Sequence, residues 1–124
     1  MDMITSVEEM ISQYVNAWNG TGIEEYQREF AKCWAVDGAY TDPNFDNING
    51  VDGIAGLAHK SLETFPVRTF SELTVPDYHH NVGRYTWKVE LPGETREGFD
   101  YFEFNESYQI TRIVSFFGPL TNIG

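Results

Sequence analysis

The periodicity of apolar residues changes near residue 67, and this change limits the folds open to the chain. Before it, apolar residues recur every three to four positions in segments 7–18, 23–35 and 51–64. That spacing is typical of helices with one buried face. After it, apolar and polar residues alternate in segments 67–75, 81–91, 96–104 and 108–118, as in strands that cover a core. We therefore predict an α+β fold with three N-terminal helices packed on a long antiparallel sheet.

Local signals mark the ends of several of these elements. Ser6 and Glu9 have the spacing of a capping box at the start of the first helix, and two glycines follow its end. Residues 38–42 add a short strand. The sequences LPGE at 91–94 and NES at 105–107 are expected to form turns between strands.

The charge of the chain excludes several classes of partner. Nineteen acidic residues against eight basic ones give a formal net charge of −11. Such a surface repels nucleic-acid phosphates and anionic membranes, so we expect neither as a partner. The first residues are acidic where a signal peptide is basic, and no apolar run approaches the ~20 residues of a membrane span. We expect one cytoplasmic domain over residues 1–124.

The sequence predicts neither a metal site nor a cofactor. Cys33 is the only cysteine, which excludes an intrachain disulfide and a thiolate zinc site, and its apolar neighbours indicate a buried side chain. His59, His79 and His80 lack metal-ligand spacing with one another or with an acidic residue. The chain contains no glycine-rich phosphate loop and no nucleophile elbow.

Six short segments, spread over nearly the whole chain, carry a resemblance to a known family. They read YVNAWNG, CWAVDGAYTDPN, INGVDGIAGL, RYTWKVEL, GFDYFEF and ITRIVSFFGP. Together with the order of the elements, they resemble the nuclear transport factor 2-like superfamily, in its SnoaL-like, polyketide cyclase and ketosteroid isomerase branch. The resemblance implies a cone-shaped fold, in which a curved antiparallel or mixed sheet wraps around three helices and encloses an apolar cavity. It also implies a homodimer formed through the outer face of the sheet.

The resemblance to ketosteroid isomerase implies a catalytic trio of Tyr14, Asp42 and Asp100. In that isomerase an aspartate is the base, while a tyrosine and a protonated aspartic acid donate hydrogen bonds to the oxyanion. The tyrosines that support the trio there have no counterpart, because Trp34 and Ala58 stand at the two corresponding positions. The superfamily also contains cyclases, dehydratases, epoxide hydrolases and non-catalytic modules, so the fold does not fix the function.

Two members of the trio also have a structural interpretation. Asp42 precedes a proline in GAYTDPN, and an Asp-Pro pair is a good start for a turn. Tyr14 lies on the apolar stripe of the first helix, where a tyrosine ring commonly fills the core.

Asp100 is a candidate independently of the family. Alternation places it on one strand face with Phe102 and Phe104. If this face is buried, desolvation raises the pKa of Asp100, which could then donate a proton near neutral pH. If the face is exposed, Asp100 pairs with Arg84 or Arg112 on neighbouring strands.

The remaining candidates are a histidine and a set of aromatic residues. At most one of His79 and His80 can face the cavity, because adjacent strand residues point to opposite faces. We choose His80 as an auxiliary acid or base; the alternative is a surface histidine beside a turn. The expected ligand-binding residues are aromatic: Trp18, Tyr40, Phe65, Trp87, Phe102 and Phe116. The tryptophans suit a core equally well.

Together these features predict a cofactor-independent enzyme that moves a proton next to the carbonyl group of a small hydrophobic molecule. The reaction would be an isomerisation, a cyclisation or a dehydration, with Asp42 as the base and Tyr14 and Asp100 as hydrogen-bond donors. The alternative is a non-catalytic module of the same fold, either ligand-binding or a dimer with a filled cavity. A cavity carboxyl group that titrates well above ~4 would favour the enzyme.

Overall fold

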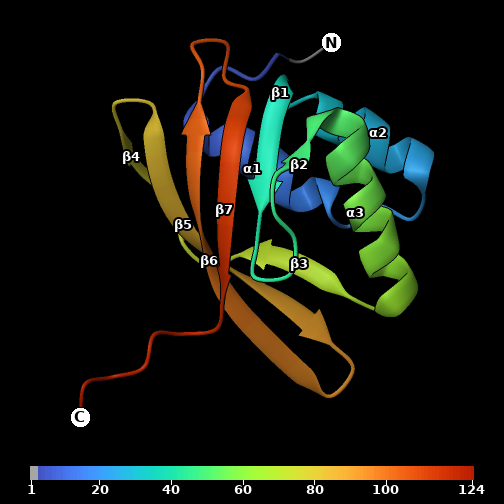
Figure 1. Cartoon of the computed structure of the whole chain (residues 1–124), viewed down its shortest axis with the longest axis vertical. Coiled ribbons are helices and arrows are strands. Elements are labelled where there is room, and N and C mark those ends of the chain that lie inside the picture. Colours follow the sequence, from blue (N-terminus) through green and yellow to red (C-terminus); the bar gives the residue numbers. More distant parts are fainter. Residues whose placement is uncertain (1–2) are drawn as a thin grey trace.

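The computed structural model describes residues 3–124, and within that range it contains three helices and seven strands (Figure 1). In chain order these are α1 (Val7–Ala17), α2 (Ile23–Ala31), β1 (Trp34–Thr41), β2 (Ile48–Asn49), α3 (Gly50–Thr64), β3 (Thr69–Glu72), β4 (Asp77–His79), β5 (Val82–Leu91), β6 (Glu94–Phe104) and β7 (Ile110–Phe117). The predicted α+β class, with three helices and a curved mixed sheet, is confirmed.

All seven strands belong to one sheet. Its order is β2-β1-β7-β6-β5-β3, and β4 pairs with the beginning of β5. Strand β1 runs parallel to β7, whereas every other pairing is antiparallel. The register shifts between Trp34 and Ala39 in β1 and between Glu103 and Phe104 in β6. Such irregularities bend strands, and the sheet curves so that the far end of the β5–β6 hairpin extends below α3 (Figure 1).

Helix α1 begins as the sequence predicts. The side chain of Ser6 accepts a hydrogen bond of 3.1 Å from the backbone N–H of Glu9, and the carboxylate of Glu9 accepts one from the hydroxyl of Ser6. Two acidic residues in the first turn also stabilise this end of the helix dipole. The helix buries one face, formed by Val7, Met10, Ile11, Tyr14, Val15 and Ala17.

The second helix is shorter than predicted. It ends at Ala31, and Trp34 begins β1 instead of extending the helix. The four-residue spacing of Phe30 and Trp34 imitates a helical stripe, but the backbone carbonyl of Cys33 accepts a hydrogen bond of 2.7 Å from the N–H of Ile110. Pairing with the last strand therefore overrides the local pattern. Cys33 is buried, as expected.

The core lies between the helices and the concave face of the sheet. Its largest fully buried side chains are Trp34, Tyr26, Phe30, Phe102 and Met10. Burial of a large apolar side chain typically stabilises a fold by about 1.5–3 kcal/mol. Helix α1 contacts β3, and α3 contacts both β1 and α2. This packing fills one part of the concave face.

Both predicted turns are present. Pro92 and Gly93 join β5 to β6, and Gly93 has a φ of +80°, which glycine adopts without strain. At the other turn, the side chain of Asn105 accepts hydrogen bonds from the N–H groups of Ser107 and Gln109. Within residues 3–124, every helix is too short or too polar to span a membrane.

Candidate functional site

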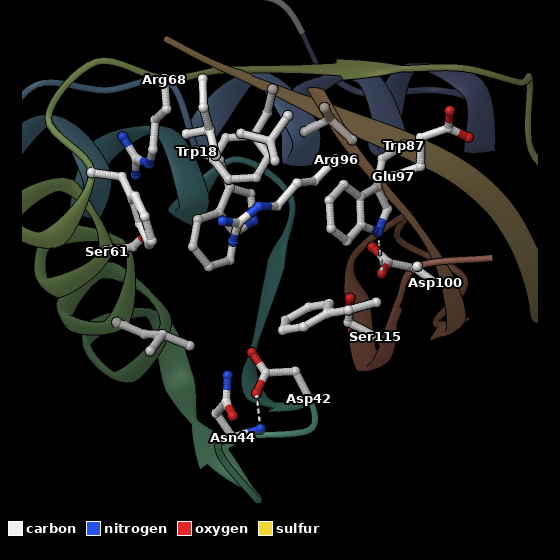
Figure 2. Close-up of a pocket in the computed structure, with 18 of the residues that line it drawn as sticks. Trp18, Asp42, Asn44, Ser61, Arg68, Trp87, Arg96, Glu97, Asp100 and Ser115 are labelled. Carbon is white, nitrogen blue, oxygen red and sulfur yellow. Dashed lines mark hydrogen bonds between the residues drawn. The ribbon is translucent and has the colours of Figure 1, made fainter. Parts of the chain in front are cut away.

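A pocket of about 820 Å³ lies between the helices and the concave side of the sheet (Figure 2). Its walls come from α1, α3, the end of β1, and strands β3, β5, β6 and β7. Pockets of this size accept small organic molecules. Tyr14, Asp42 and Asp100 all line it, as do four of the six predicted aromatic residues: Trp18, Tyr40, Phe65 and Trp87.

Asp100 lies on the inner face of β6 and is only 3% exposed. Its cross-strand neighbours are Tyr85 on β5 and Ser115 on β7. The hydroxyl of Tyr85 donates a hydrogen bond to Oδ2, and the indole Nε1–H of Trp87 donates one of 2.9 Å to Oδ1. Arg84 instead forms its ion pair with Asp77 at the surface. The interpretation of Asp100 as the partner of a surface arginine is therefore wrong.

The environment of Asp100 changes its acidity. Burial favours the neutral carboxyl group and raises the pKa of Asp100 from 3.8 to about 6. Hydrogen bonds from Tyr85 and Trp87 and the nearby hydroxyl of Ser115 oppose this rise, while the nearby charge of Asp42 adds to it. Desolvation is the largest effect, so Asp100 can hold or release a proton close to neutral pH.

A glycine on β6 gives Trp87 the space to reach Asp100. Gly98 is the cross-strand neighbour of Trp87. A Cβ atom at position 98 would lie 2.8 Å from Cε2 of the Trp87 ring and would also meet the backbone oxygen of Phe116. Because the glycine lacks a side chain, the indole can lie across β6 with its N–H directed at the carboxyl group.

Asp42 both begins a turn and lines the pocket, the two roles that its sequence suggests. It follows the last residue of β1, and its Oδ1 accepts hydrogen bonds from the backbone N–H groups of Asn44 (2.8 Å) and Phe45 (2.9 Å). These contacts form the predicted turn. Its Oδ2 accepts a hydrogen bond of 2.8 Å from the hydroxyl of Tyr40, and the side chain is half-buried at the pocket wall (Figure 2).

Three tyrosines supply neutral hydroxyl groups to the pocket. Burial raises the pKa values of Tyr14, Tyr40 and Tyr85 well above 10, so all three stay protonated at physiological pH. The buried hydroxyl of Ser115 lies near Tyr40 and Asp100 and opposes the rise in both pKa values. Polar groups therefore line the pocket from Asp42 through Tyr40 and Ser115 to Asp100.

Sequence analysis missed the tyrosine and serine partners of the two carboxyl groups. A signal for one of them was present, because Tyr85 and Trp87 share a strand face and the Pro92–Gly93 turn fixes the register of the hairpin. With Leu91 opposite Glu94, residue 85 must lie opposite residue 100. Nothing comparable predicts Ser115, whose position depends on the longer connection between β6 and β7.

The expected positions of His80, Phe102 and Phe116 in the pocket are wrong. His80 is exposed in the turn after β4, where it has a φ of +49°. Its ring contacts that of His79. Phe102 faces inward but is completely buried in the core beside Tyr85. Phe116 is 46% exposed on the outer face and stacks on Phe99, with ring centroids 4.9 Å apart.

The pocket also contains groups that the sequence did not predict. Three of the eight basic residues line it: Lys60, Arg68 and Arg96. Within the described range, no group of three or more histidine, cysteine, aspartate or glutamate side chains is arranged to hold a metal ion. The site combines the carboxyl groups of Asp42 and Asp100 with neutral hydroxyl groups and nearby cations, and the exposed Glu97 also lines it.

Comparisons with known proteins identify structural relatives but no sequence relatives. No protein-family model and no curated protein sequence matches the chain. A candidate isomerase of the SnoaL-like family from Agrobacterium tumefaciens strain C58 has a TM-score of 0.83 and 25% identity, covering 93% of this chain and 100% of that chain. A candidate ketosteroid isomerase from Kribbella flavida has a TM-score of 0.69 and 15% identity, covering 95% and 82%.

A third relative was crystallised with a small molecule. This protein from Catenulispora acidiphila has a ketosteroid isomerase-like fold and forms a complex with trimethylamine. Its TM-score is 0.72 at 13% identity, and the match covers 91% of this chain and 88% of that chain. The resemblance inferred from the sequence motifs is thus confirmed by the fold. The chain has the fold of the nuclear transport factor 2-like superfamily and is similar to SnoaL-like and ketosteroid isomerase-like proteins.

Proposed function

We propose that this protein is a cofactor-independent enzyme that transfers a proton next to the carbonyl group of a small hydrophobic substrate. The reaction class is isomerisation, cyclisation or dehydration. The observation that carries the proposal is Asp100, a buried carboxyl group with a pKa of about 6 in the same pocket as a second carboxylate, Asp42. Shifted pKa values of this kind are typical of acid–base sites.

The proposed mechanism gives each carboxyl group a different role. Asp42, as a carboxylate, takes a proton from the carbon next to the carbonyl. The electron pair of the broken C–H bond shifts toward the carbonyl oxygen and gives an enolate. Neutral Asp100 and the hydroxyl of Tyr14 donate hydrogen bonds to that oxygen. Each such donor typically lowers the barrier by a few kcal/mol. Asp42 then returns the proton to another carbon atom in an isomerisation or to the leaving hydroxyl group in a dehydration. In a cyclisation the enolate carbon attacks a second carbonyl of the substrate, and Asp42 returns the proton to the alkoxide that forms.

The surroundings of Tyr14 support its role as a donor. Tyr14 lines the pocket, and burial raises the pKa of its hydroxyl well above 10. The hydroxyl therefore keeps a proton that it can donate to a ligand. Stacking on Trp34, with ring centroids 5.6 Å apart, holds the tyrosine ring in place.

The structural relatives support the same reaction class. Two of them are described as candidate isomerases, one of the SnoaL-like family and one of the ketosteroid isomerase type. The complex of the Catenulispora protein with trimethylamine supports the use of this fold to bind small molecules. We further propose that the protein acts in the cytoplasm as a homodimer. The stacked Phe99 and Phe116 rings on the outer sheet face support such an interface.

One observation favours the alternative of a non-catalytic binding module. The carboxylate of Asp42 accepts three hydrogen bonds within the protein, two of them from the backbone of its own turn. A residue that only shapes the loop would make the same contacts. The two functions differ in whether the protein accelerates the exchange of a carbon-bound proton.

Hydrogen exchange next to a carbonyl tests the proposal without knowledge of the natural substrate. In D₂O, the protein is expected to accelerate deuterium uptake by uncharged cyclic ketones and β-keto esters, measured by proton NMR. The kcat/KM of exchange should fall about tenfold per pH unit above pH 6, because the neutral form of Asp100 is lost there.

The variant Asp100→Asn is the matched control for this pH dependence. An asparagine amide stays neutral and still donates hydrogen bonds, so the decline above pH 6 should disappear. A kcat/KM that rises through pH 6 would show that Asp100 acts as a base, and the proposed roles would be wrong. An absence of exchange with every ketone would favour the binding module.

A further inference from the structure

The distribution of positive charge is uneven in this acidic protein. The sequence holds eight basic residues against nineteen acidic ones, yet Lys60, Arg68 and Arg96 all line the pocket. Four of the other basic residues form surface ion pairs: Arg28, Lys32, Arg84 and Lys88. A pocket that gathers cations in a chain of net charge −11 is suited to an anionic group.

Arg68 is held in place without a counter-ion. Its Nη2 donates to the hydroxyl of Tyr26 (3.2 Å) and to the backbone oxygen of Ala58 (3.3 Å). Its guanidinium carbon lies 5.3 Å from the centroid of the Phe70 ring. Within residues 3–124 no carboxylate lies within 4.0 Å of its nitrogens, and its buried Nε–H has no hydrogen-bond partner.

Such an arrangement is unfavourable in the absence of a ligand. A partly buried charge without a partner loses hydration and gains no ion pair, and an unpaired buried donor adds to this cost. The neutral contacts to Tyr26 and Ala58 orient the guanidinium but leave its charge uncompensated. A carboxylate matches the fork of an arginine and can accept two parallel hydrogen bonds.

Arg96, on strand β6, supplies a second cation. It pairs with Glu94 at 2.9 Å, but both side chains are more than half exposed, so the pair is weak. Its guanidinium lies 5.7 Å from the centroid of the Phe65 ring and extends into the pocket (Figure 2). Glu97 also lines the pocket, but it is exposed and its carboxylate points away from Arg96. Arg96 can therefore exchange its surface partner for a ligand.

The charged groups of the pocket are separated by sign. In Figure 2, Arg68 lies on the side of the pocket next to α3, whereas Asp100 lies on the opposite side. Asp42 lies at the turn that follows β1. A ligand that spans the pocket therefore meets cations at one end and the carboxyl groups at the other. Aromatic side chains, including those of Trp18, Phe70 and Trp87, form the wall between the two ends.

We propose that the substrate is an oxo acid: a hydrophobic molecule with a carboxylate that binds Arg68 and Arg96 and a carbonyl group that faces Asp42 and Asp100. This inference rests on the proposed function, because it names the substrate class of the same site. The carboxylate end fixes the orientation of the ligand, since repulsion from the two aspartates disfavours the reversed arrangement.

A matched pair of ligands tests the proposal by binding alone. The probes are 4-oxo-4-phenylbutanoic acid and its neutral carboxamide, which differ only in the charged group. Binding is followed by the indole N–H signals of Trp18 and Trp87 in ¹⁵N NMR spectra. Trp34 serves as an internal reference, because its indole is buried in the core and bonded to the backbone oxygen of Gly38.

The acid is expected to bind at least about tenfold more tightly than the carboxamide, as charge-assisted hydrogen bonds require. Arg68→Gln should remove most of this preference, because it weakens the binding of the charged acid far more than that of the neutral carboxamide. Arg84→Gln, which alters an exposed arginine on the outer face, should preserve it. If Arg68→Gln fails to fold, judged by the Trp34 signal, Arg96→Gln provides a second test with a smaller expected loss.

The proposal is overturned if the acid binds the wild-type protein no better than the carboxamide does. It is also overturned if the Arg68→Gln and Arg96→Gln variants both keep the full preference. The outcome is separate from that of the exchange assay, which uses uncharged ketones. If the protein prefers the acid but shows no exchange, the oxo acid site stands and the proposed catalysis is rejected. If it shows exchange but no preference, the proposed catalysis stands and the oxo acid site is rejected.

Discussion

Replacing Asp100 by asparagine is expected to raise the free energy of unfolding by about 3 kcal/mol at pH 7. In the folded protein the pKa of Asp100 is raised from 3.8 to about 6, chiefly because burial disfavours the ionised form. A difference of one in pKa corresponds to about 1.4 kcal/mol, so the ionised carboxyl group costs about 3 kcal/mol when it is buried. An asparagine amide carries no charge, and its oxygen and NH₂ group can still bond to Trp87 and Tyr85.

The gain from Asp100→Asn should depend on pH in a defined way. Below pH 3.8 the carboxyl group is neutral in both the folded and the unfolded chain, so it makes no electrostatic difference. As the pH rises from 3.8 to about 6, the unfolded chain ionises first and the folded wild-type protein loses stability. The difference between variant and wild type should therefore grow over this interval and stay constant above it.

Urea unfolding at pH 4, 5, 6 and 7 measures this difference. Asp77→Asn is the matched control, because Asp77 is exposed on the outer face and its ion pair with Arg84 is weak. An Asp100→Asn variant that is no more stable than the wild type at pH 7 would contradict the account of a destabilised buried carboxyl group. The test requires no substrate.

Asp42→Asn is expected to lower the kcat/KM of ketone exchange by about 10²–10⁴-fold, the usual contribution of a general base. The substitution is isosteric, and its amide oxygen can accept the same two backbone hydrogen bonds from Asn44 and Phe45. The hydroxyl of Tyr40 can rotate to accept a bond from the new NH₂ group. The turn, the pocket and ligand affinity should therefore be preserved while the base is lost.

Asp46→Asn controls for the loss of a carboxylate in the same loop. Asp46 is exposed, accepts a hydrogen bond of 3.1 Å from the hydroxyl of Thr41, and does not line the pocket. Its substitution should leave exchange unchanged. An Asp42→Asn variant that exchanges as fast as the wild type would show that Asp42 only shapes the turn.

The fold was predictable because its periodic signals are long and consistent. The stripe of α1 and the alternation of β5 and β6 persist over many residues, and the Pro92–Gly93 turn fixes the register between the two strands. The errors arose where local and tertiary signals differ. Trp34 matches a helical stripe, but pairing with β7 places it on a strand. The short strands β2 and β4 have too few residues to show any period.

The candidate site was predictable only in part. Asp42, Tyr14 and Asp100 line one pocket, as do Trp18 and Trp87. Phe116 was misplaced because the register of β7, which follows a bulge, puts Ser115 and not Phe116 on the inner face. Arg68 had no signal at all, since its role depends on a pocket formed by segments that are distant in the sequence.

The central claim is that Asp100 can hold a proton near neutral pH, and a carboxyl titration tests it most directly. The ¹³Cγ signal of Asp100 is identified by its loss in the Asp100→Asn variant and is followed from pH 3 to pH 8. We expect a midpoint near pH 6, because burial outweighs the polar contacts of the carboxyl group. A midpoint near 3.8 would show that the surroundings of Asp100 do not favour its neutral form, and the proposed acid–base site would lose its physical basis.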